Sequence, residues 1–372
     1  MRTQTLLLVL ALSLAGCAQA PSQGCRVGFD IGSSGIRAGA TTGDVQGRVS
    51  VDYLADVWAD NVIDETVDAT ATALGELAPR HHDCTAVAGG YSAWRLAAEK
   101  GGSDKVADTL RDLQRRTGAY VFVIPQAVEG SYGYFAAKQQ LGERLTTPFI
   151  LDVGGGSLQF AAGHTGWGTA LGQKAWRKLF CAQVKGSENP NCATNPVGAR
   201  AAEQSAQVLS NELAQAKAAL GTGFAVTAVS TPVVHGVHPI LAYLSHDRNA
   251  IAGRVDATGF DRAALDSAIG LLADKDDAGI VQLLNGCRDG AGKPICADRF
   301  ASTFVTDMLL VRSFMAGLQV TRMDVAEADI TNVPGILADE RAFAWIKAYP
   351  CYLARLRAQG MDAYTSDPRS CP

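Results

Sequence analysis

Short apolar runs alternate along the chain with longer stretches in which apolar residues recur at helical spacing. Strand-like runs cover residues 26–40, 85–89, 120–124, 149–163, 224–230 and 323–326. Helical spacing covers residues 63–77, 92–100, 103–117, 130–141, 198–220, 261–273 and 300–318, with Ser103 as an expected N-cap. The alternation of strands and helices predicts an α/β architecture.

Two of the strand-like stretches share one plan, in which an Asp, an apolar residue and a glycine-rich turn precede a second strand. The first is DIGSSGIR from Asp30 and the second is DVGGGSLQ from Asp152. A turn without side chains lets backbone N–H groups approach an anion closely. An adjacent Asp suits a hydrated divalent cation bound to phosphate oxygens, although Asp before Gly is also common in ordinary hairpins. The repetition suggests a duplicated domain with a phosphate compound bound between the halves.

Residues 1–16 differ from the rest of the chain. Arg2 precedes an apolar run that is too short to span a bilayer and that ends in Leu-Ala-Gly before Cys17. This order predicts a secretory signal peptide and resembles a bacterial lipoprotein box, with cleavage before Cys17 and acylation of its thiol. Ala18 would then favour the outer membrane, and residues 17–25 would be a tether. The alternative is an ordinary signal peptidase site after Ala20.

The chain has nine cysteines, so that eight remain after Cys17, and an even number in an exported chain predicts disulfides. Short separations and loop-like surroundings suggest three pairs, and the two remaining cysteines form a fourth. The suggested pairs are Cys181–Cys192, Cys287–Cys296, Cys351–Cys371 and Cys25–Cys84. Many other pairings are open from the sequence alone. Zinc is the competing use of cysteine, but no CxxC pair or His cluster at ligand spacing occurs.

The composition, 47% hydrophobic and 19% charged over 372 residues, is that of a globular protein long enough for two domains. The formal net charge is −4 and no Lys/Arg run occurs, so nucleic acid is not an expected partner. Local groups would have to hold a substrate anion. No segment after the signal peptide looks transmembrane.

Four motifs, taken together and in this order, resemble the actin-like superfamily that joins exopolyphosphatase/guanosine pentaphosphate phosphatases to apyrase-type nucleoside triphosphate diphosphohydrolases. The segment from Asp30 looks like the first phosphate loop, and GGYSAWR from Gly89 is similar to the second apyrase region, with Ala93 where Gly is usual. QAVEGSYGY from Gln126 resembles the third region, and the segment from Asp152 the fourth. The third region and the Gln at 159 are closer to apyrases, whereas residues 227–243 and 299–337 are closer to exopolyphosphatases.

The resemblance covers residues 26–340. It implies an α/β, two-domain, actin-like (ribonuclease H-like) ATPase fold with duplicated mixed sheets and a site in the cleft between the domains. The first domain would cover residues 26–147 and the second residues 148–337. The C-terminal segment, from about residue 338 to 372, would pack back on the first domain.

The resemblance also implies hydrolysis of a phosphoanhydride, which needs charge neutralisation, an in-line water and a group that orients or deprotonates that water. On this reading Asp30 and Asp152 hold Mg²⁺ or Ca²⁺, largely through water, and Glu129 is the base. The other predicted site residues are Ser157 and Gln159 to position the water, Arg37 and Arg95 to clamp the terminal phosphoryl group, and a phosphate cradle of Ser33, Ser34, Gly35, Gly154, Gly155 and Gly156.

Several of these residues have a plain structural alternative. Glu129 would also serve as a helix cap, and Arg95 would serve equally as a structural residue. Trp167 and Trp176 are expected in the core more than stacked on a base. The turn after Ser230 reads STPVVHG, apolar and proline-stiffened, where relatives carry a Gly/Thr-rich turn beside the nucleoside. Nucleotide selectivity is therefore open, and linear polyphosphate or diphosphates remain as substrates.

The expected function is an exported, lipid-anchored, metal-dependent hydrolase that releases terminal phosphate from nucleotides or polyphosphate. The alternative is a binding lipoprotein of the same fold that holds nucleotide or phosphate without turnover. A sugar or acetate kinase is a weaker alternative, because ATP is scarce outside the cytoplasm. The expected partners are the substrate and a membrane reached through the lipid anchor, and the oligomeric state stays open.

Overall fold

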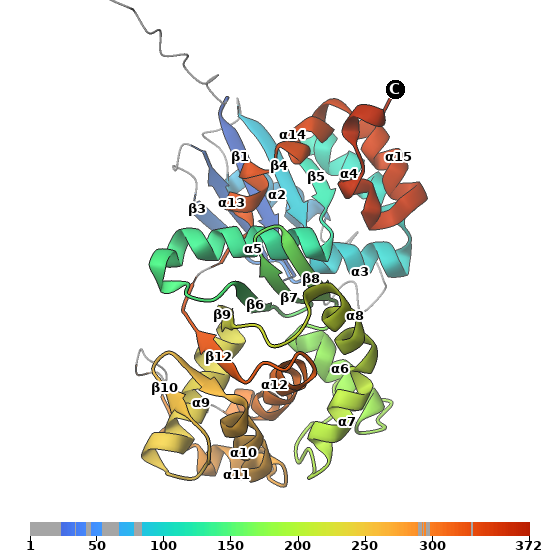
Figure 1. The fold of residues 1–372 in the computed structure, drawn as a ribbon. Coiled ribbons are helices and arrows are strands. Elements are labelled where there is room, and N and C mark those ends of the chain that lie inside the picture. The colour runs from blue at the N-terminus through green and yellow to red at the C-terminus, as the bar shows by residue number, and fades with distance from the viewer. Residues whose placement is uncertain are drawn as a thin grey trace, which may run out of the picture.

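The computed structural model describes residues 24–33, 35–41, 46–53, 67–77, 84–288, 292, 294, 298–328 and 330–372. Two β-sheets lie one above the other, and helix α5 (Gln126–Leu141) runs between them (Figure 1). Each sheet with the helices that cover it is called a half here. The signal peptide, Cys17 and most of the predicted tether lie outside the described residues.

The first half is built on a five-stranded mixed sheet in the order β3-β2-β1-β4-β5. Its central strand β1 pairs antiparallel with β2 and parallel with β4, β2 pairs antiparallel with β3, and β4 pairs parallel with β5. The strands are β1 (Arg26–Ile31), β2 (Ile36–Ala40), β3 (Gln46–Val49), β4 (Thr85–Gly90) and β5 (Tyr120–Val123).

The second half has a seven-stranded sheet in the order β10-β11-β12-β9-β6-β7-β8. Its strands β8-β7-β6-β9-β12 repeat the order and directions of the first sheet, which agrees with the predicted duplication. The strands are β6 (Phe149–Val153), β7 (Leu158–Ala162), β8 (Thr165–Thr169), β9 (Val226–Ala228), β10 (Val255–Asp256), β11 (Gly259–Asp261) and β12 (Arg322–Val325).

Helix α4 shows how the sequence sets the helices of the first half. Its apolar residues Val106, Leu110 and Leu113 recur on one face and are buried. The helix ends at Gly118, whose φ of 74° is left-handed and whose N–H bonds to the Gln114 carbonyl. Ser103 is not the N-cap, because it is already the first helical residue. The helices are α2 (Val67–Leu77), α3 (Ser92–Gly101), α4 (Ser103–Thr117), α14 (Glu340–Lys347) and α15 (Tyr349–Gln359).

Helices of the second half surround the long helix α12. The predicted single helix over 198–220 is two helices, because the buried Leu209 leaves helical geometry with a ψ of 9°. Trp167 and Trp176 lie in the core as expected. The helices are α6 (Gln173–Gln183), α7 (Ala201–Val208), α8 (Ser210–Leu220), α9 (His238–Ala242), α10 (Arg262–Leu272), α11 (Asp277–Leu283) and α12 (Asp298–Gly317).

Each half sends one helix against the other. Helix α5 follows β5 of the first sheet but packs on β7 and β8 of the second. Helix α13 (Val333–Ala338) follows β12 of the second sheet but packs on β1, and it also contacts α5. The core of the first half accordingly includes Ile336 of α13 and Trp345, Tyr352 and Tyr364 of the C-terminal segment.

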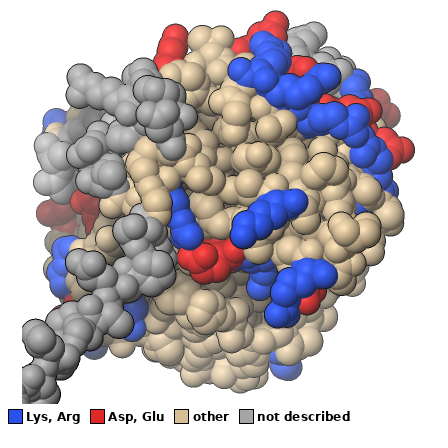
Figure 2. All heavy atoms as spheres, turned by 90° about the horizontal axis from the view of Figure 1, so that it is seen from above, with Lys and Arg blue, Asp and Glu red and all other residues tan. Residues whose placement is uncertain are grey.

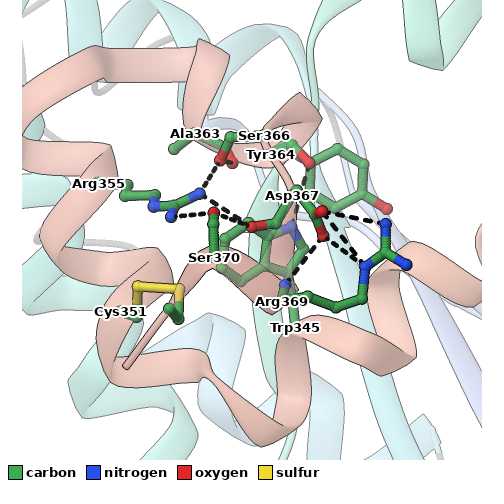
Figure 3. Close-up of a disulfide and its surroundings, with 10 residues drawn as sticks. Trp345, Cys351, Arg355, Ala363, Tyr364, Ser366, Asp367, Arg369 and Ser370 are labelled. Carbon is green, nitrogen blue, oxygen red and sulfur yellow. Dashed lines mark hydrogen bonds and ion pairs between the residues drawn. A yellow bond between two sulfur atoms is a disulfide. The ribbon is translucent and has the colours of Figure 1, made fainter.

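The C-terminal segment is fastened by one disulfide and one arginine (Figure 3). Cys351 of α15 is joined to Cys371, next to the chain end. Arg355 donates to the Ser366 and Ser370 hydroxyl groups, both at 2.7 Å, and to the Asp367 carbonyl at 3.2 Å. These contacts hold the last turns against the helix that precedes them.

Disulfides also join Cys25 to Cys84 and Cys181 to Cys192, so three of the pairs suggested by the sequence are present. The fourth suggested pair, Cys287–Cys296, lies outside the described residues because Cys296 does. Among the helices that the structure describes, none is long and apolar enough to span a membrane. On the face seen from above, basic and acidic side chains are interspersed (Figure 2).

Candidate active site

The Asp-led turns of the two sheets open on one cavity of about 510 Å³ between the halves. Asp30, Ser33 and Arg37 line it from the first half, and Asp152 lines it from the second. Glu129 reaches it from α5, the helix between the sheets. Tyr91 and Ser92 of the second motif line it as well, so the structure brings residues from all four predicted motifs into one place.

The two turns share an equivalent backbone hydrogen bond. The N–H of Gly32 donates to the Gly35 carbonyl at 2.9 Å, and the N–H of Gly154 donates to the Ser157 carbonyl at 2.8 Å. A Cβ on Gly155 would lie 3.5 Å from the Ser33 hydroxyl oxygen, so the turns face each other at close range. The arrangement suits a compound with phosphate groups held between two backbone turns.

The strand register repeats as well. Asp30 lies opposite Arg37 across β1 and β2, and Asp152 lies opposite Gln159 across β6 and β7. Arg37 and Gln159 are thus equivalent positions of the duplicated hairpin with different chemistry. One half presents a cation to the cleft, while the other presents an amide that contacts Glu129.

Helix α6 is docked on the second turn. Its first N–H groups, from Gln173 and Lys174, donate to the carbonyls of Gly154 and Gly155 at 2.9 and 2.8 Å. A Cβ on Gly172 would lie 2.4 Å from the Gly154 carbonyl oxygen, so only glycine permits this approach. Both carbonyls are therefore turned toward α6 and away from an anion in the cavity.

Gln173 itself lines the cavity and was not predicted as a site residue. Its side-chain amide donates to the Asp307 carboxylate of α12 at 2.5 Å. Burial raises the pKa of Asp307 to about 7, although the Arg177 charge and the Gln173 amide oppose the shift. Asp307 and Gln173 are far apart in sequence and belong to no motif, so nothing in the sequence pairs them.

Asp30 is held by the segment that precedes α13. Its Oδ2 accepts from the Asn332 backbone N–H at 2.9 Å and from the Thr331 hydroxyl at 3.2 Å. Burial raises the pKa of Asp30, while the Asn332 N–H and the Arg37 charge oppose that shift. The sequence analysis did not identify Thr331 or Asn332. Their position in the chain could have identified them. The segment after β12 corresponds in the repeat to the segment after β5, which contains Glu129.

Asp152 stands in the field of two other carboxylates. Burial raises the pKa of its carboxyl to about 7, the negative charges of Glu129 and Asp30 add to the shift, and Arg37 opposes it. The described residues contain no group of three His, Cys, Asp or Glu that forms a metal site by itself. Oxygen donors that repel each other still fit a cation such as Mg²⁺, which keeps several waters and needs few protein ligands.

Glu129 lies in the first turn of α5 because that helix begins at Gln126, directly after Pro125. The predicted helix start near residue 130 was one turn late. A Cβ on Gly130 would lie 3.3 Å from the Ala161 Cβ, so the glycine after Glu129 allows α5 to approach β7 closely. This contact sets Glu129 beside Gln159.

Two side chains hold Glu129. The Arg95 guanidinium lies 2.6 Å from Glu129 Oε2, and the Gln159 amide donates to the same oxygen at 3.1 Å. Burial raises the pKa of Glu129, and the charge of Arg95 opposes that rise. The same Gln159 nitrogen donates to the Ser157 hydroxyl oxygen at 2.8 Å, and Ser157 lines the cavity.

Arg95 does not lie where the sequence analysis expected it, as a clamp on the terminal phosphoryl group. It is 3% exposed and is outside the described lining of the cavity, and its other guanidinium nitrogen donates to the Ile124 carbonyl at 2.8 Å. Both terminal nitrogens of its guanidinium group thus have partners within the protein, and Arg95 holds Glu129 in position. A signal for this was available, since Arg95 follows the fully buried Trp94 on α3.

Arg37 does line the cavity, and its guanidinium donates to the Ile330 carbonyl. A second arginine, Arg48 of β3, lies opposite Arg37 in the strand register and lines the same cavity. The sequence analysis missed Arg48 because it did not predict β3. The two guanidinium groups bring positive charge to the first-half side of the cleft.

The predicted phosphate cradle also lies in the lining. Ser33 and Gly35 line the cavity, and so do Gly154, Gly155 and Gly156. A Cβ on Gly35 would lie 2.4 Å from the Val49 carbonyl oxygen, which excludes other residues there. Ser34 lies outside the described residues.

The segment after β9 is helical and not the predicted loop. Pro232–Val237 forms a π-helical turn, a rare geometry that often occurs at functional sites. Pro232, Val234 and His235 line the cavity, and His235 lies 3.2 Å from the Glu327 carboxylate. This side of the cavity is therefore bounded by apolar side chains, an imidazole and the Glu327 carboxylate.

Solved structures of the Ppx/GppA phosphatases share this fold. A Ppx/GppA family member from Aquifex aeolicus matches with a TM-score of 0.56 and 16% identity, over 87% of this chain and 98% of that protein. A type II variant of the Aquifex aeolicus phosphatase matches with a TM-score of 0.55 and 16% identity, over 84% and 98%. An exopolyphosphatase from Cytophaga hutchinsonii matches with a TM-score of 0.51 and 14% identity, over 84% and 96%.

The chain therefore has the two-domain α/β fold of the Ppx/GppA phosphatases, which confirms the predicted fold class and the resemblance to that superfamily. Identities this low establish the fold alone.

No family model matches the chain. A curated protein, an uncharacterized protein of Streptomyces coelicolor, is 39% identical over 57 residues, which is 15% of this chain and 17% of that protein's length.

Proposed function

We propose that the protein is an exported, metal-dependent phosphoanhydride hydrolase that releases terminal phosphate from nucleotides or polyphosphate. The observation that carries the proposal is the placement of Glu129. Its carboxylate enters the cavity between two facing phosphate-type turns and is fixed on one oxygen by Arg95 and Gln159. A positioned carboxylate between two anion-binding turns is what activation of a water beside a phosphoryl group requires.

In the proposed reaction a water is oriented by Glu129 and Ser157. The water oxygen forms a bond to the terminal phosphorus, the bridging P–O bond breaks, and the shortened phosphate chain leaves with that electron pair. The proton of the water passes to Glu129. Ser157 accepts a hydrogen bond from Gln159 at 2.8 Å, which leaves its own hydroxyl hydrogen to donate into the cavity.

Asp30 and Asp152 would hold Mg²⁺ or Ca²⁺ through water molecules. When bound, the cation would neutralise charge on the phosphate oxygens. Arg37 and Arg48 would bind phosphate oxygens from the first half, and the turns at Ser33–Gly35 and 154–156 would cradle them. Arg95 would act on the reaction through Glu129 and not through the substrate.

Export is part of the proposal. Three disulfides in the described residues suit an oxidising compartment, and residues 1–17 carry the features of a signal peptide with a lipoprotein box. Acylation at Cys17 would anchor the protein to a membrane, and Ala18 favours the outer one. A binding lipoprotein that holds phosphate compounds without turnover is the second candidate, supported by the apolar turn at residues 230–236.

The test is phosphate release by the full chain, produced with oxidised cysteines, from ATP, ADP, GTP and long-chain polyphosphate. Each substrate is assayed with Mg²⁺, Ca²⁺ or EDTA, and Glu129→Gln is the matched control. We expect metal-dependent release that the variant loses while it keeps ligand binding. Binding without release in both proteins would instead support the binding lipoprotein.

A further inference from the structure

A second cavity, of about 340 Å³, lies beside α6 and is called the α6 cavity here. One wall is the face of α6 that carries Lys174, Arg177 and Lys178, and the other is the loop that contains Cys192. Its volume is within the range of small-molecule sites. It shares no lining residue with the cavity that contains Glu129.

The α6 cavity is basic. Its three cationic side chains occupy one helix face at spacings of three and four residues, where like charges repel and destabilise the helix. Burial lowers the pKa of Lys178, and the charge of Lys100 on α3 adds to that shift. No acidic residue is among the described residues that line the cavity. This concentration of positive charge, in a chain whose formal net charge is −4, favours an anionic ligand.

The walls of the cavity are held in place. The Cys181–Cys192 disulfide joins α6 to the opposite loop. The Thr194 hydroxyl donates to the Ser302 carbonyl of α12 at 2.6 Å, which fixes the end of that loop. A preformed basic cavity loses less conformational entropy on binding than flexible surface lysines do.

Lys174 connects the α6 cavity to the second phosphate turn. Its Cδ and Cε lie 3.7 and 3.9 Å from the position of a Cβ on Gly155, so its stem lies along that turn. Gly155 lines the cavity with Glu129, and Lys174 lines the α6 cavity. Lys174 therefore lies beside both the second phosphate turn and the α6 cavity, which Lys178 also lines.

We propose that the α6 cavity binds phosphate groups of a chain substrate that lie beyond those held between the two turns. The proposal rests on the proposed function, since it assigns a further subsite to the same substrate. The ligand is a linear phosphate chain long enough to pass over Gly155. A short chain fills only the cleft.

The experiment measures dissociation constants of orthophosphate, tripolyphosphate and long-chain polyphosphate by titration calorimetry. The full chain is used in the Glu129→Gln background, so that the ligand is not consumed and the result does not depend on turnover. The test variant adds Lys178→Glu. The matched control adds Lys217→Glu, the same charge reversal at an exposed position of α8.

We expect Lys178→Glu to weaken long-chain polyphosphate binding about tenfold, as expected for loss of one charge-assisted contact, and to leave tripolyphosphate within about twofold. Lys217→Glu should change neither constant. Equal effects of Lys178→Glu on both ligands, or no effect on the long chain, would overturn the proposal. A change confined to orthophosphate binding would also overturn it and would assign the cavity to free phosphate. Absence of turnover in the wild-type chain would overturn the proposed function and leave this comparison intact.

Discussion

At the scale of single residues, the Arg95 guanidinium and the Gln159 amide both contact Oε2 of Glu129. The remaining oxygen is therefore the one that a water in the cavity would meet. Arg95 and Glu129 form an ion pair with side chains only 3% and 12% exposed, so each charge depends on the other for its stabilisation.

We predict that Arg95→Met lowers the free energy of unfolding by about 3 kcal/mol, because it leaves the Glu129 charge buried without a cation. The loss should be smaller when Glu129→Gln is already present, since no buried charge is then left without a counter-ion. Urea denaturation of the four proteins of this double-mutant cycle measures the coupling. Equal losses in both backgrounds would show that the pair does not contribute to stability.

We predict a pH-dependent effect of Asp307→Asn on stability. The folded state raises the pKa of Asp307 from 3.8 to about 7, so the folded protein holds this proton more tightly than the unfolded chain. Its contribution is complete below about pH 4 and is lost as the pH rises through about 7, at roughly 1.4 kcal/mol per unit.

The free energy of unfolding of Asp307→Asn relative to wild type should therefore increase by up to about 4 kcal/mol between about pH 4 and pH 8. Denaturation at both values tests this. Gln173→Ala serves as a control, because it removes the partner but keeps the titrating group. A difference between Asp307→Asn and wild type that does not change with pH would contradict the shift.

How far the site could be read from the sequence depends on whether a residue belongs to a motif. Asp30 and Asp152 were predicted because an apolar residue and a glycine-rich turn follow each of them, and Glu129 because its segment resembles the third apyrase region. Arg48 was out of reach, since its position depends on pairing between β2 and β3. The partner of Arg95 could not be predicted either, because the ion pair forms only when α3 and α5 pack together.

At the scale of elements, helix α6 does the most to shape the site. It binds the carbonyls of the second phosphate turn at one end, and its Trp176 donates to the Thr306 carbonyl of α12 at 2.8 Å. The helix was not predicted, although its residue Trp176 was expected in the core. Where the sequence predicted elements from periodicity, as for α4, α10 and α12, the structure agrees closely.

We predict that Gly172→Ala lowers kcat/KM at least tenfold, because a Cβ there would lie 2.4 Å from both the Gly154 carbonyl oxygen and the Ser157 nitrogen. Either α6 or the phosphate turn must therefore move to relieve this clash. Steady-state phosphate release measures the effect. Gly75→Ala in α2, where a Cβ would meet nothing within 4 Å, is the control and should keep full activity.

The segment after β9 was predicted as an apolar, proline-stiffened turn. Val233 and Val237 are buried, however, and the chain is helical there. Tertiary packing outweighed the local signal. This turn bounds the cavity, so under the proposed function the part of the site that would separate nucleotide from polyphosphate is the part that the sequence predicts least well.

At the scale of the whole molecule, the carboxylates of both halves meet in one cleft. The charge of Asp30 raises the pKa of Glu129, and the charges of Glu129 and Asp30 raise the pKa of Asp152, so a bound cation would relieve a repulsion between the halves. The folded chain offers this arrangement and the unfolded chain does not, so a cation should stabilise the fold.

We predict that Mg²⁺ at about a hundred times its dissociation constant raises the free energy of unfolding by about 2.7 kcal/mol. Thermal unfolding with Mg²⁺ and with EDTA measures the shift. Asp152→Asn should abolish the response to Mg²⁺ and raise the stability of the metal-free protein, because one of three repelling charges is gone. An unchanged response in Asp152→Asn would remove that residue from the cation site.

The crossing of α5 and α13 has a consequence for how the chain can be divided. Residue 147, at the end of the first predicted domain, lies beyond a helix that packs on the second sheet. A fragment ending there would take Glu129 away from Gln159 and Ser157, and a fragment starting at 148 would keep the turn but lose the proposed base. Neither of these two fragments would therefore hold the complete proposed site. Under the proposed function, only a chain that contains both halves would be active.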